Sequence, residues 1–290
     1  MQIAAPANLA CPIDALALEP QSGGLRCGNG HSYDRAREGY TNLLVVQHKA
    51  SRDPGDSRDM VAARRRFLEA GHFAPIADAV FRAVQRCQQS RGSDQPFNIL
   101  DAGCGEGYYL DRLVQLAASD PDPAILTFIG IDVSKWAVRA AARRSTAATW
   151  LVANNRHPPF LPASVDLIVC LFGFPVWEGF RTVLRPDGRV LLVDPGPDHL
   201  IELRQIIYPT VERSEPTPLV VAGLGLMFED TVRFPVTLTT PAAIADLLAM
   251  TPHAHRLPQT GREALAHVQT LTVTADVSLR LLSNQSEIEA

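Results

Sequence analysis

The segment with the most chemical information is a glycine-rich loop that follows a short apolar run. The apolar run, residues 97–101, ends on the carboxylate of Asp101, and Gly103, Gly105 and Gly107 follow at alternate positions. Glycines at this spacing let the backbone approach a ligand closely and adopt positive φ values. The pattern G-x-G-x-G after an acid differs from the G-x-G-x-x-G of dinucleotide folds. An acid before the loop would repel a pyrophosphate, but it suits a cationic, methionine-like group.

Two further polar residues follow the next two predicted strands. Asp132 ends an apolar run, where a carboxylate can accept both hydroxyls of a ribose. Asn154 follows the extended stretch 150–152, where a side-chain amide can read an adenine edge. With Asp101 and the loop, these residues are typical of class I S-adenosylmethionine-dependent methyltransferases. Two alternatives stay open at this point, namely a glycine turn without a ligand and a nucleotide-dependent dehydrogenase.

A second group of residues near the start of the chain has the spacing of metal ligands. Cys11 and Asp14, then Cys27 and His31, form two pairs separated by a turn-rich segment. Such pairs are typical of a small structural zinc module, in which the first pair would normally be C-x2-C. A site with Asp14 as a ligand would be weaker, because zinc favours soft thiolates. The sequence predicts either one structural zinc ion or a metal-free module of the same shape.

The elements that must position these residues follow from the apolar periodicity. Residues 62–86 are predicted to form one helix, residues 91–96 a linker, and strands alternate with helices from residue 97 onwards. The predicted strands are 97–101, 125–131, 150–152, 165–172, 189–193, 220–234 and 270–282; the predicted helices are 108–118, 134–144, capped by Ser134, and 241–249, with Pro241 in its first turn. Short apolar strands separated by helices predict an α/β fold with a parallel sheet covered on both faces.

Composition and charge narrow the class of protein. The 290 residues are 46% hydrophobic and 20% charged, which indicates a folded globular chain. The net charge of −4 excludes a wholly basic nucleic-acid-binding protein. Five cysteines, an odd number, argue against a disulfide scaffold. The chain shows no secretory leader and no apolar run of about 18 residues, so we expect a cytoplasmic protein without a membrane partner.

One stretch, residues 35–66, is locally basic. It holds eight basic and four acidic residues, a net charge of +4, and its basic residues are Arg35, Arg37, Lys49, Arg52, Arg58, Arg64, Arg65 and Arg66. Such a stretch can neutralise phosphates, and Tyr40, His48 and Phe73 are aromatic residues that could stack on an RNA base. The alternative is a solvated helix face with incidental arginines.

Longer motifs carry a more specific resemblance. They are H-S-Y-D-R-A-R-E-G-Y-T-N-L-L at residues 31–44, F-L-E-A-G-H-F at 67–73, D-A-G-C-G-E-G-Y-Y at 101–109, D-V-S-K at 132–135 and P-G-P-D-H-L at 195–200. In this order, over almost the whole chain, the sequence resembles the RlmA family of 23S rRNA guanine-N1-methyltransferases.

The resemblance implies three parts: a zinc-ribbon-like RNA-recognition module at residues 1–50, a helical hinge at 51–95 and a Rossmann-like S-adenosylmethionine-binding domain at 96–290. It implies methylation of N1 of a guanine in a 23S rRNA hairpin, a homodimer whose cleft accepts that hairpin, and, for some members, resistance to macrolide antibiotics. The cofactor contacts implied are Phe73, Asp101, Gly103, Gly105, Tyr109, Leu110, Asp132 and His199, in addition to Asn154, which its position after the third strand predicts.

The sequence departs from the family pattern at two places. Asp14 stands where a zinc cysteine is expected, and residues 171–177 form an unusually apolar loop after the fourth predicted strand, where the target base is usually held. The alternative functions are an N-methyltransferase of a small purine-like heterocycle in secondary metabolism and a non-catalytic RNA-binding protein. A carboxylate could take the proton from guanine N1, and the candidates are Glu178, Asp194 and Asp198.

Overall fold

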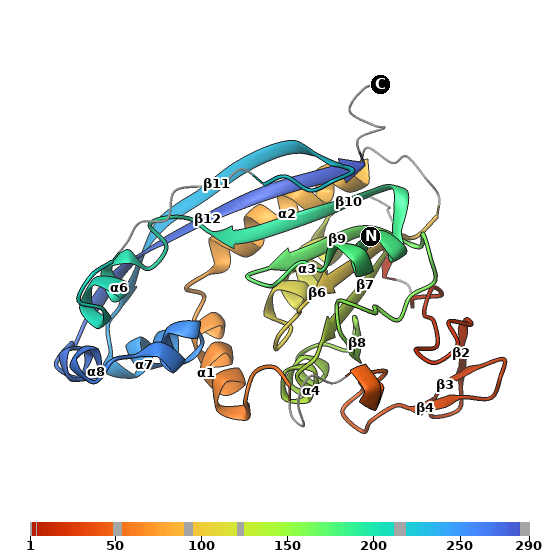
Figure 1. The fold of residues 1–290 in the computed structure, drawn as a ribbon, viewed down its shortest axis with the longest axis horizontal. Helices are drawn as coiled ribbons and strands as arrows, with labels where there is room; N and C mark the ends of the chain where they lie inside the picture. Colours follow the sequence, from red (N-terminus) through yellow and green to blue (C-terminus); the bar gives the residue numbers. More distant parts are fainter. Residues whose placement is uncertain are drawn as a thin grey trace.

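A nine-stranded mixed sheet forms the body of the molecule, and a three-stranded sheet lies beside it (Figure 1). The structure is a computed structural model that describes residues 2–3, 5–48, 54–89, 95–120, 125–211 and 219–284. The strands of the large sheet are β1 (Gln2–Ile3), β5 (Thr41–Asn42), β6 (Phe97–Ala102), β7 (Ile125–Asp132), β8 (Thr149–Val152), β9 (Val165–Leu171), β10 (Leu184–Pro195), β11 (Leu224–Leu238) and β12 (Leu271–Asn284). The small sheet consists of β2 (Leu18–Gln21), β3 (Gly24–Cys27) and β4 (Ser32–Asp34).

The strand order of the large sheet is β11-β12-β10-β9-β6-β7-β8-β5, with β1 paired to β7. The strands from β5 to β10 run parallel, and β12 is antiparallel to both β10 and β11. The chain order reverses at β6, which lies between β7 and β9. Open α/β sheets bind ligands outside the carboxyl ends of the strands at such a switch point, and both Asp101 and Asp132 lie there.

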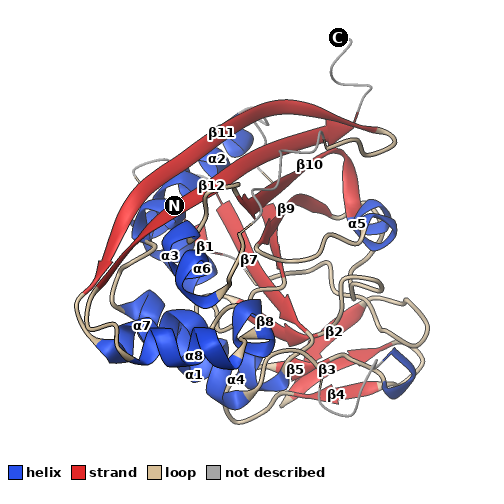
Figure 2. Cartoon of the chain, turned by 60° about the vertical axis from the view of Figure 1, so that its left-hand side comes forward, coloured by secondary structure: helices blue, strands red, loops and turns tan. Residues whose placement is uncertain are grey.

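Both faces of the central strands are buried, as the continuous apolar runs predict. Adjacent residues such as Ile99 and Leu100 in β6 belong to different core clusters, because successive strand residues point to opposite faces. One face packs against α2 (Ala74–Gln89), α3 (Tyr108–Ser119) and α4 (Lys135–Arg144). The other packs against α5 (Trp177–Val183) and the N-terminal segment (Figure 2).

The prediction of one helix over residues 62–86 is wrong, because the segment forms two helices, α1 (Arg58–Glu69) and α2. Gly71 adopts φ +80°, and its N–H bonds to the carbonyl of Leu68 at 2.9 Å, which ends α1. Pro75 in the first turn of α2 has no N–H and cannot continue a preceding helix. The break places Phe73 between the two helices.

The other predicted elements are present, with boundaries that shift by a few residues. Ser134 caps α4, accepting the N–H of Ala137 at 3.3 Å, and Pro241 is the first residue of α7 (Pro241–Ala249). The remaining helices are α6 (Ile201–Ile207), α8 (Gln259–Ala266) and the short 3₁₀ turns η1 (Val46–His48) and η2 (Pro252–Arg256). The predicted linker lies mostly outside the described residues. None of the described helices is long and apolar enough to cross a membrane.

Packing crosses both predicted domain boundaries. Strand β5 of the N-terminal part pairs with β8 of the large sheet, and the side-chain amide of Asn8 donates to the carbonyl of Ser164 at 3.0 Å. Helix α2, in the predicted hinge, is buried in the same core cluster as α3. The division at residues 50 and 95 therefore stays a prediction about function, while the core is continuous.

Candidate active site and metal site

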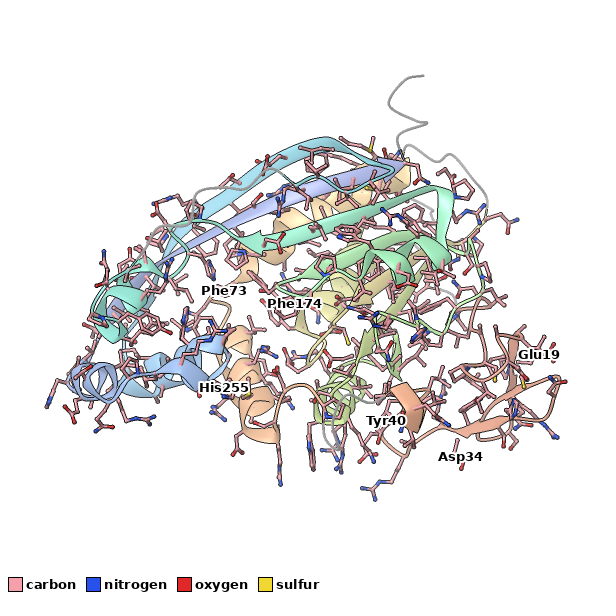
Figure 3. All side chains as sticks on the ribbon, in the orientation of Figure 1. Glu19, Asp34, Tyr40, Phe73, Phe174 and His255 are labelled. Carbon is pink, nitrogen blue, oxygen red and sulfur yellow. The ribbon has the colours of Figure 1, made fainter. Side chains whose placement is uncertain are left out.

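A cavity of about 1590 Å³ opens at the carboxyl ends of β6 and β7. The glycine loop forms its floor, and Gly103 and Gly107 take φ values of +98° and +83°. A Cβ on Gly107 would also stand 2.7 Å from the ring of Trp150. Phe73, Phe174 and His255, labelled in Figure 3, are among the lining residues. Eight of the nine predicted cofactor residues line this cavity: Phe73, Asp101, Gly103, Gly105, Tyr109, Asp132, Asn154 and His199.

The ninth, Leu110, has no exposed surface and lies in the core cluster beside the cavity, not among its lining residues. Asn154 uses its side-chain oxygen locally, accepting the N–H groups of Arg156 at 3.1 Å and of His157 at 2.8 Å. This bonding fixes the orientation of the Asn154 amide at the edge of the cavity.

Asp101 is a buried carboxylate with an unsatisfied oxygen. The residue is 2% exposed, and its Oδ1 has no hydrogen-bond partner among the described residues. Burial raises the pKa of Asp101 to about 8, and the nearby charge of Asp132 adds to the rise. An acceptor left in this state is costly unless a donor arrives from a ligand. A cationic amino group beside Asp101 would favour the ionised carboxylate and lower its pKa, so it is the partner best suited to this site.

Asp132 ties the end of β7 to the glycine loop. Its Oδ2 accepts the N–H of Gly105 at 2.9 Å, and its Oδ1 accepts the N–H of Ser134 at 2.8 Å. Burial raises the pKa of Asp132, while these two backbone donors oppose the rise. Each carboxylate oxygen can accept a second hydrogen bond, so Asp132 can hold the loop and a ligand hydroxyl together.

Aromatic rings form one wall of the cavity. The ring of Phe172 lies 6.5 Å from that of Phe73, 5.8 Å from that of His199 and 6.3 Å from that of Tyr109, measured between centroids. Phe172 adopts φ +52°, a conformation that non-glycine residues rarely take. Backbone strain of this kind is common at ligand sites. Phe172 belongs to the apolar loop that the sequence singled out.

His199 is held in one protonation state. Burial lowers its pKa to about 4, so the ring is neutral at pH 7. Its Nδ1 accepts the N–H of Asp276 at 3.2 Å, which leaves the proton on Nε2. His199 therefore offers the site a neutral N–H donor.

Arg64 is a cavity residue that the sequence did not assign to the site. Its guanidinium pairs with Asp56 and donates to the carbonyl of Met250 at 3.0 Å, and it lies 3.6 Å from a Cβ placed on Gly105. Met60, Arg64 and Leu68 all line the cavity and share one face of α1. The four-residue spacing of Met60, Arg64 and Leu68 in the sequence could have indicated that they share a helix face.

The predicted phosphate face is divided by the structure. Arg64 turns to the cavity, Arg65 pairs with Glu69 at 2.8 Å, and Arg66 pairs with Asp246 of α7 at 2.9 Å. These three arginines do not form one surface. Lys49 and Arg52 lie outside the described residues.

A buried acid within the glycine loop, which the sequence analysis did not assign to the site, bonds to α4. Glu106 is 1% exposed and bonds to Nε of Arg144 at 3.0 Å. Burial raises the pKa of Glu106, and the charge of Arg144 opposes the rise. Cys104, between the glycines, is also buried, and burial raises the pKa of its thiol. A protonated thiol agrees with a packing role for Cys104.

The part of the cavity wall formed by β10 and β12 carries a charge pair. Asp194 at the end of β10 bonds to Arg280 of β12 at 2.6 Å, and both line the cavity. Of the three candidate proton acceptors, Asp194 alone lines it. Glu178 is exposed on α5, and Asp198 bonds to Arg233 at 2.9 Å.

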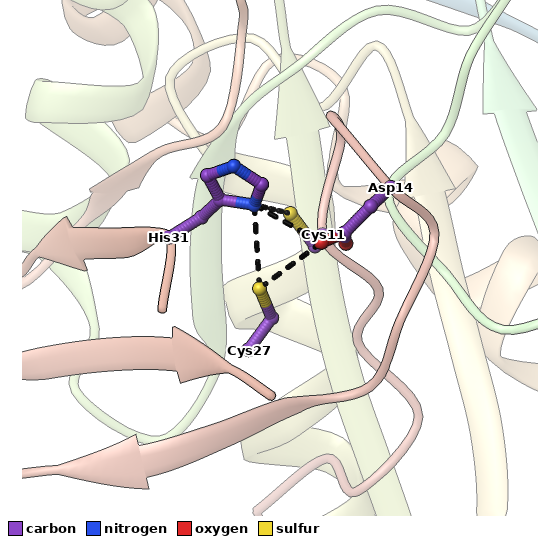
Figure 4. A group of neighbouring side chains, drawn as sticks. All are labelled: Cys11, Asp14, Cys27 and His31. Carbon is purple, nitrogen blue, oxygen red and sulfur yellow. Dashed lines mark hydrogen bonds and ion pairs between the residues drawn. The ribbon is translucent and has the colours of Figure 1, made fainter. Parts of the chain in front are cut away.

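The four predicted metal ligands converge in the N-terminal module (Figure 4). One ligand atom from each of Cys11, Asp14, Cys27 and His31 lies within 4.8 Å of the others. Nδ1 of His31 lies 3.6 Å from Sγ of Cys11, 3.4 Å from Sγ of Cys27 and 3.0 Å from Oδ2 of Asp14. The turns before β2 and after β3 bring the two pairs together.

These distances suit a tetrahedral zinc ion. Usual zinc–ligand bond lengths imply S···N and S···O separations of about 3.6 Å and an N···O separation of about 3.4 Å. Sγ of Cys27 lies 3.4 Å from Oδ2 of Asp14, near that value. All five cysteines are free thiols. The residues present therefore fit zinc, with Asp14 as the one oxygen ligand.

Comparison with known proteins agrees with this geometry. A family described as RlmA, N-terminal, matches residues 9–52, and one described as Methyltransferase domain matches residues 99–194. The strand order, the glycine loop and the carboxylates at the ends of β6 and β7 define a class I S-adenosylmethionine-dependent methyltransferase. The dehydrogenase alternative is thereby excluded.

The similarity to individual proteins extends over most of the chain. A putative 23S rRNA (guanine-N1)-methyltransferase of Micromonospora griseorubida is 35% identical, over 90% of this chain and 84% of its own length. The corresponding values for the putative 23S rRNA (guanine-N1)-methyltransferase YxjB of Bacillus subtilis are 30%, 93% and 94%. Those for the 23S rRNA (guanine(748)-N1)-methyltransferase of Streptomyces fradiae are 36%, 67% and 66%. The chain belongs to the RlmA family.

Proposed function

We propose that this enzyme transfers a methyl group from S-adenosylmethionine to N1 of a guanine in a hairpin of 23S rRNA. The observation that carries the proposal is its likeness to two relatives with this named activity over 90% and 93% of the chain. The cavity supports it, because it continues from the glycine loop to the pair Asp194–Arg280 and leaves room for a base beside the cofactor.

Different residues of the cavity are suited to different parts of S-adenosylmethionine. Asp101 is suited to the amino group, Asp132 to the ribose hydroxyls and Asn154 to the adenine edge, while Phe73 and Phe172 supply apolar walls. The bound cofactor supplies an electrophilic methyl group on a sulfonium. Orientation of two reactants alone can supply about 7–11 kcal/mol, so positioning by the loop and the aromatic wall is a large part of the catalysis.

The pair Asp194–Arg280 is complementary in polarity to a guanine edge. Guanine presents N1–H and an exocyclic amine as donors beside the acceptor O6, and proteins read such edges of unpaired bases by hydrogen bonds. Asp194 can accept from N1–H and the amine, and Arg280 can donate to O6. Asp194 is then placed to take the N1 proton as the methyl group is transferred.

A small purine-like heterocycle is the second candidate substrate, and the loop after β9 favours it. Phe172 lines the cavity, and Phe174 in the same loop is 88% exposed. Exposed aromatic rings at the mouth of a site can stack on a free flat ring as well as on a base held in RNA. The two substrates call for the same cofactor site, so the assay must compare them directly.

Primer extension decides between these substrates. Ribosomal RNA from a host that lacks this methylation is probed with and without the gene, and purified enzyme is assayed on free guanine-like heterocycles. A gene-dependent stop at a hairpin guanine is the expected result. Turnover of a free heterocycle without any stop would overturn the rRNA assignment.

Three further properties belong to this proposal. An enzyme that modifies rRNA works where ribosomes assemble, so we infer a cytoplasmic location. The homodimer implied by the family is tested by sedimentation with and without a hairpin RNA. A raised macrolide tolerance in the complemented host would link the methylation to resistance, as the resemblance implies.

A further inference from the structure

A second hollow lies outside the cofactor cavity, in a groove of about 550 Å³ between α1 and α4. Val61, Ala62 and Ala140 form apolar parts of its lining, and the other lining residues are Arg58 and Arg65 from α1 and Trp136, Arg139 and Arg143 from α4. Residues three, four or seven apart share a helix face, so each helix turns one arginine-bearing face to the groove. Neighbouring helices usually place an apolar stripe there.

The groove has more positive than negative charge. Glu38 bonds to Arg139 at 2.7 Å and to Arg143 at 3.1 Å. Glu69 bonds to Arg65, and the guanidinium of Arg58 lies 6.0 Å from the centroid of the Trp136 ring. Among the described residues, these four guanidinium groups share two carboxylates, of which Glu69 also pairs with Arg144, in a protein whose net charge is −4. Charge concentrated against the overall sign indicates an anionic partner.

The groove and the active-site cavity share no lining residue, but the segments that precede the two helices link them along the chain. Asp56 precedes α1 and Val133 precedes α4, and both line the cavity. The two helices run in the same direction, because Arg58 lies over Trp136 in their first turns and Glu69 bonds to Arg144 at 3.2 Å in their last. Arg58 and Trp136 therefore lie only two and three residues beyond positions that line the cavity, next to the helix face that carries Arg64.

We propose that this groove binds the RNA strand next to the target nucleotide. Phosphates lie against Arg58, Arg65 and Arg143, and an unpaired base stacks on the Trp136–Arg58 pair, since aromatic rings and guanidinium planes are the surfaces on which proteins stack RNA bases. The inference rests on the proposed rRNA substrate. It moves the phosphate contacts from the linear basic stretch to a surface shared by α1 and α4.

The test uses the full protein and an unmodified synthetic 23S rRNA hairpin that contains the target guanine. The double variant Arg58→Gln/Arg143→Gln removes two charges but keeps the pairs Glu38–Arg139 and Glu69–Arg65. We expect hairpin affinity to fall about tenfold or more at physiological salt, and the slope of log affinity against log salt to fall by about 1.4 to 1.8. Trp136→Ala should weaken binding about tenfold, and Trp136→Phe should restore most of it.

A matched control removes two exposed arginines elsewhere, Arg82→Gln on α2 and Arg262→Gln on α8. Cofactor affinity, measured by calorimetry, should be unchanged in the groove and control variants, which also shows that they fold. Equal loss of RNA binding in both double variants would overturn the groove, because overall charge would explain it. Unchanged RNA binding with an altered oligomeric state would overturn it in favour of an interface between copies.

Methylation of the hairpin is measured in parallel, which separates the two proposals. Groove-dependent binding without methylation by the wild-type protein would overturn the proposed reaction and support the groove. Methylation that is insensitive to the groove variants, in KM for RNA as well as in kcat, would support the reaction and overturn the groove.

Discussion

Asp101 and Asp132 end adjacent parallel strands, and the negative charge of Asp132 helps to raise the pKa of Asp101. When both are ionised, two buried carboxyl groups at one sheet edge repel each other, and the oxygens of Asp132 already accept backbone N–H groups. A cationic ligand group beside Asp101 both satisfies its open oxygen and reduces this repulsion. The cofactor site is therefore least stable when empty.

The first prediction is that Asp101→Asn stabilises the cofactor-free protein at high pH. The folded-state pKa of Asp101, about 8, is above the unfolded value of about 3.9, so its stabilising contribution is complete below pH 4 and is lost as pH rises through 8. Asparagine does not titrate. In urea unfolding at pH 8, the variant should exceed the wild type by at least about 1 kcal/mol, a difference that shrinks towards pH 5.

Cofactor binding should move in the opposite direction. Asp101→Asn removes the charge that faces the amino group, so S-adenosylmethionine should bind at least about tenfold more weakly. If the variant bound the cofactor as well as the wild type, or if its stability followed pH as the wild type does, the role given to Asp101 would be wrong.

The second prediction concerns Asp132 and the ribose. Charge-assisted hydrogen bonds contribute about 1.5–3 kcal/mol, so Asp132→Ala should weaken cofactor binding about tenfold or more. Because Asp132 also holds the N–H of Gly105, part of that loss is structural. Calorimetry with a cofactor analogue that lacks the ribose hydroxyls separates the two effects. The analogue should bind wild type weakly and lose little more in the variant; an equal loss for both ligands would leave the hydroxyl contact unsupported.

The third prediction is that zinc occupies the N-terminal module and that Asp14→Cys binds it more tightly. A thiolate in place of a carboxylate gives zinc a softer ligand, and the site geometry already has ligand spacing suited to a tetrahedral ion. Elemental analysis of protein purified without chelator should show close to one equivalent. Less than about a tenth of an equivalent would mean that the module folds without metal.

The fourth prediction separates neighbouring arginines on α1. Arg64→Ala should weaken cofactor binding, because Arg64 lies beside Gly105 and holds Asp56 and the carbonyl of Met250 at the cavity. Arg66→Ala should leave cofactor affinity nearly unchanged, and its exposed pair with Asp246 should cost no more than about 1 kcal/mol of stability. Calorimetry and thermal unfolding of both variants provide the comparison, and equal effects on the cofactor would contradict the separation.

Those parts of the site that depend on local sequence patterns could be predicted from the sequence. Asp101, the glycines and Asp132 lie at strand ends, where alternation of strands and helices already places a ligand. The cysteine and histidine spacing likewise predicted the cluster in the N-terminal module. In both cases a local pattern predicts the cluster, because the strands or turns that carry the residues are close together in the sequence.

Residues brought in from distant segments could not be predicted in this way. The pair Asp194–Arg280 depends on the insertion of β12 beside β10, and the pairing of Arg66 with Asp246 depends on how α7 packs on α1. The break at Gly71 had a visible signal in Pro75, but apolar periodicity continues across it and favoured one helix. The net charge of the stretch 35–66 could not show how its arginines are distributed, because partners from elsewhere in the chain, such as Asp246, determine where each side chain points; its role in phosphate binding stays a prediction.

Strand β5, only two residues long, is the outermost strand of the large sheet next to β8. A strand this short offers few unpaired backbone groups to another chain, which is one way that proteins prevent sheet-to-sheet aggregation. Removing the N-terminal module would leave the apolar strand Thr149–Val152 as an open edge. The N-terminal part of the chain, through β5, therefore protects the edge of the catalytic sheet from pairing with another molecule.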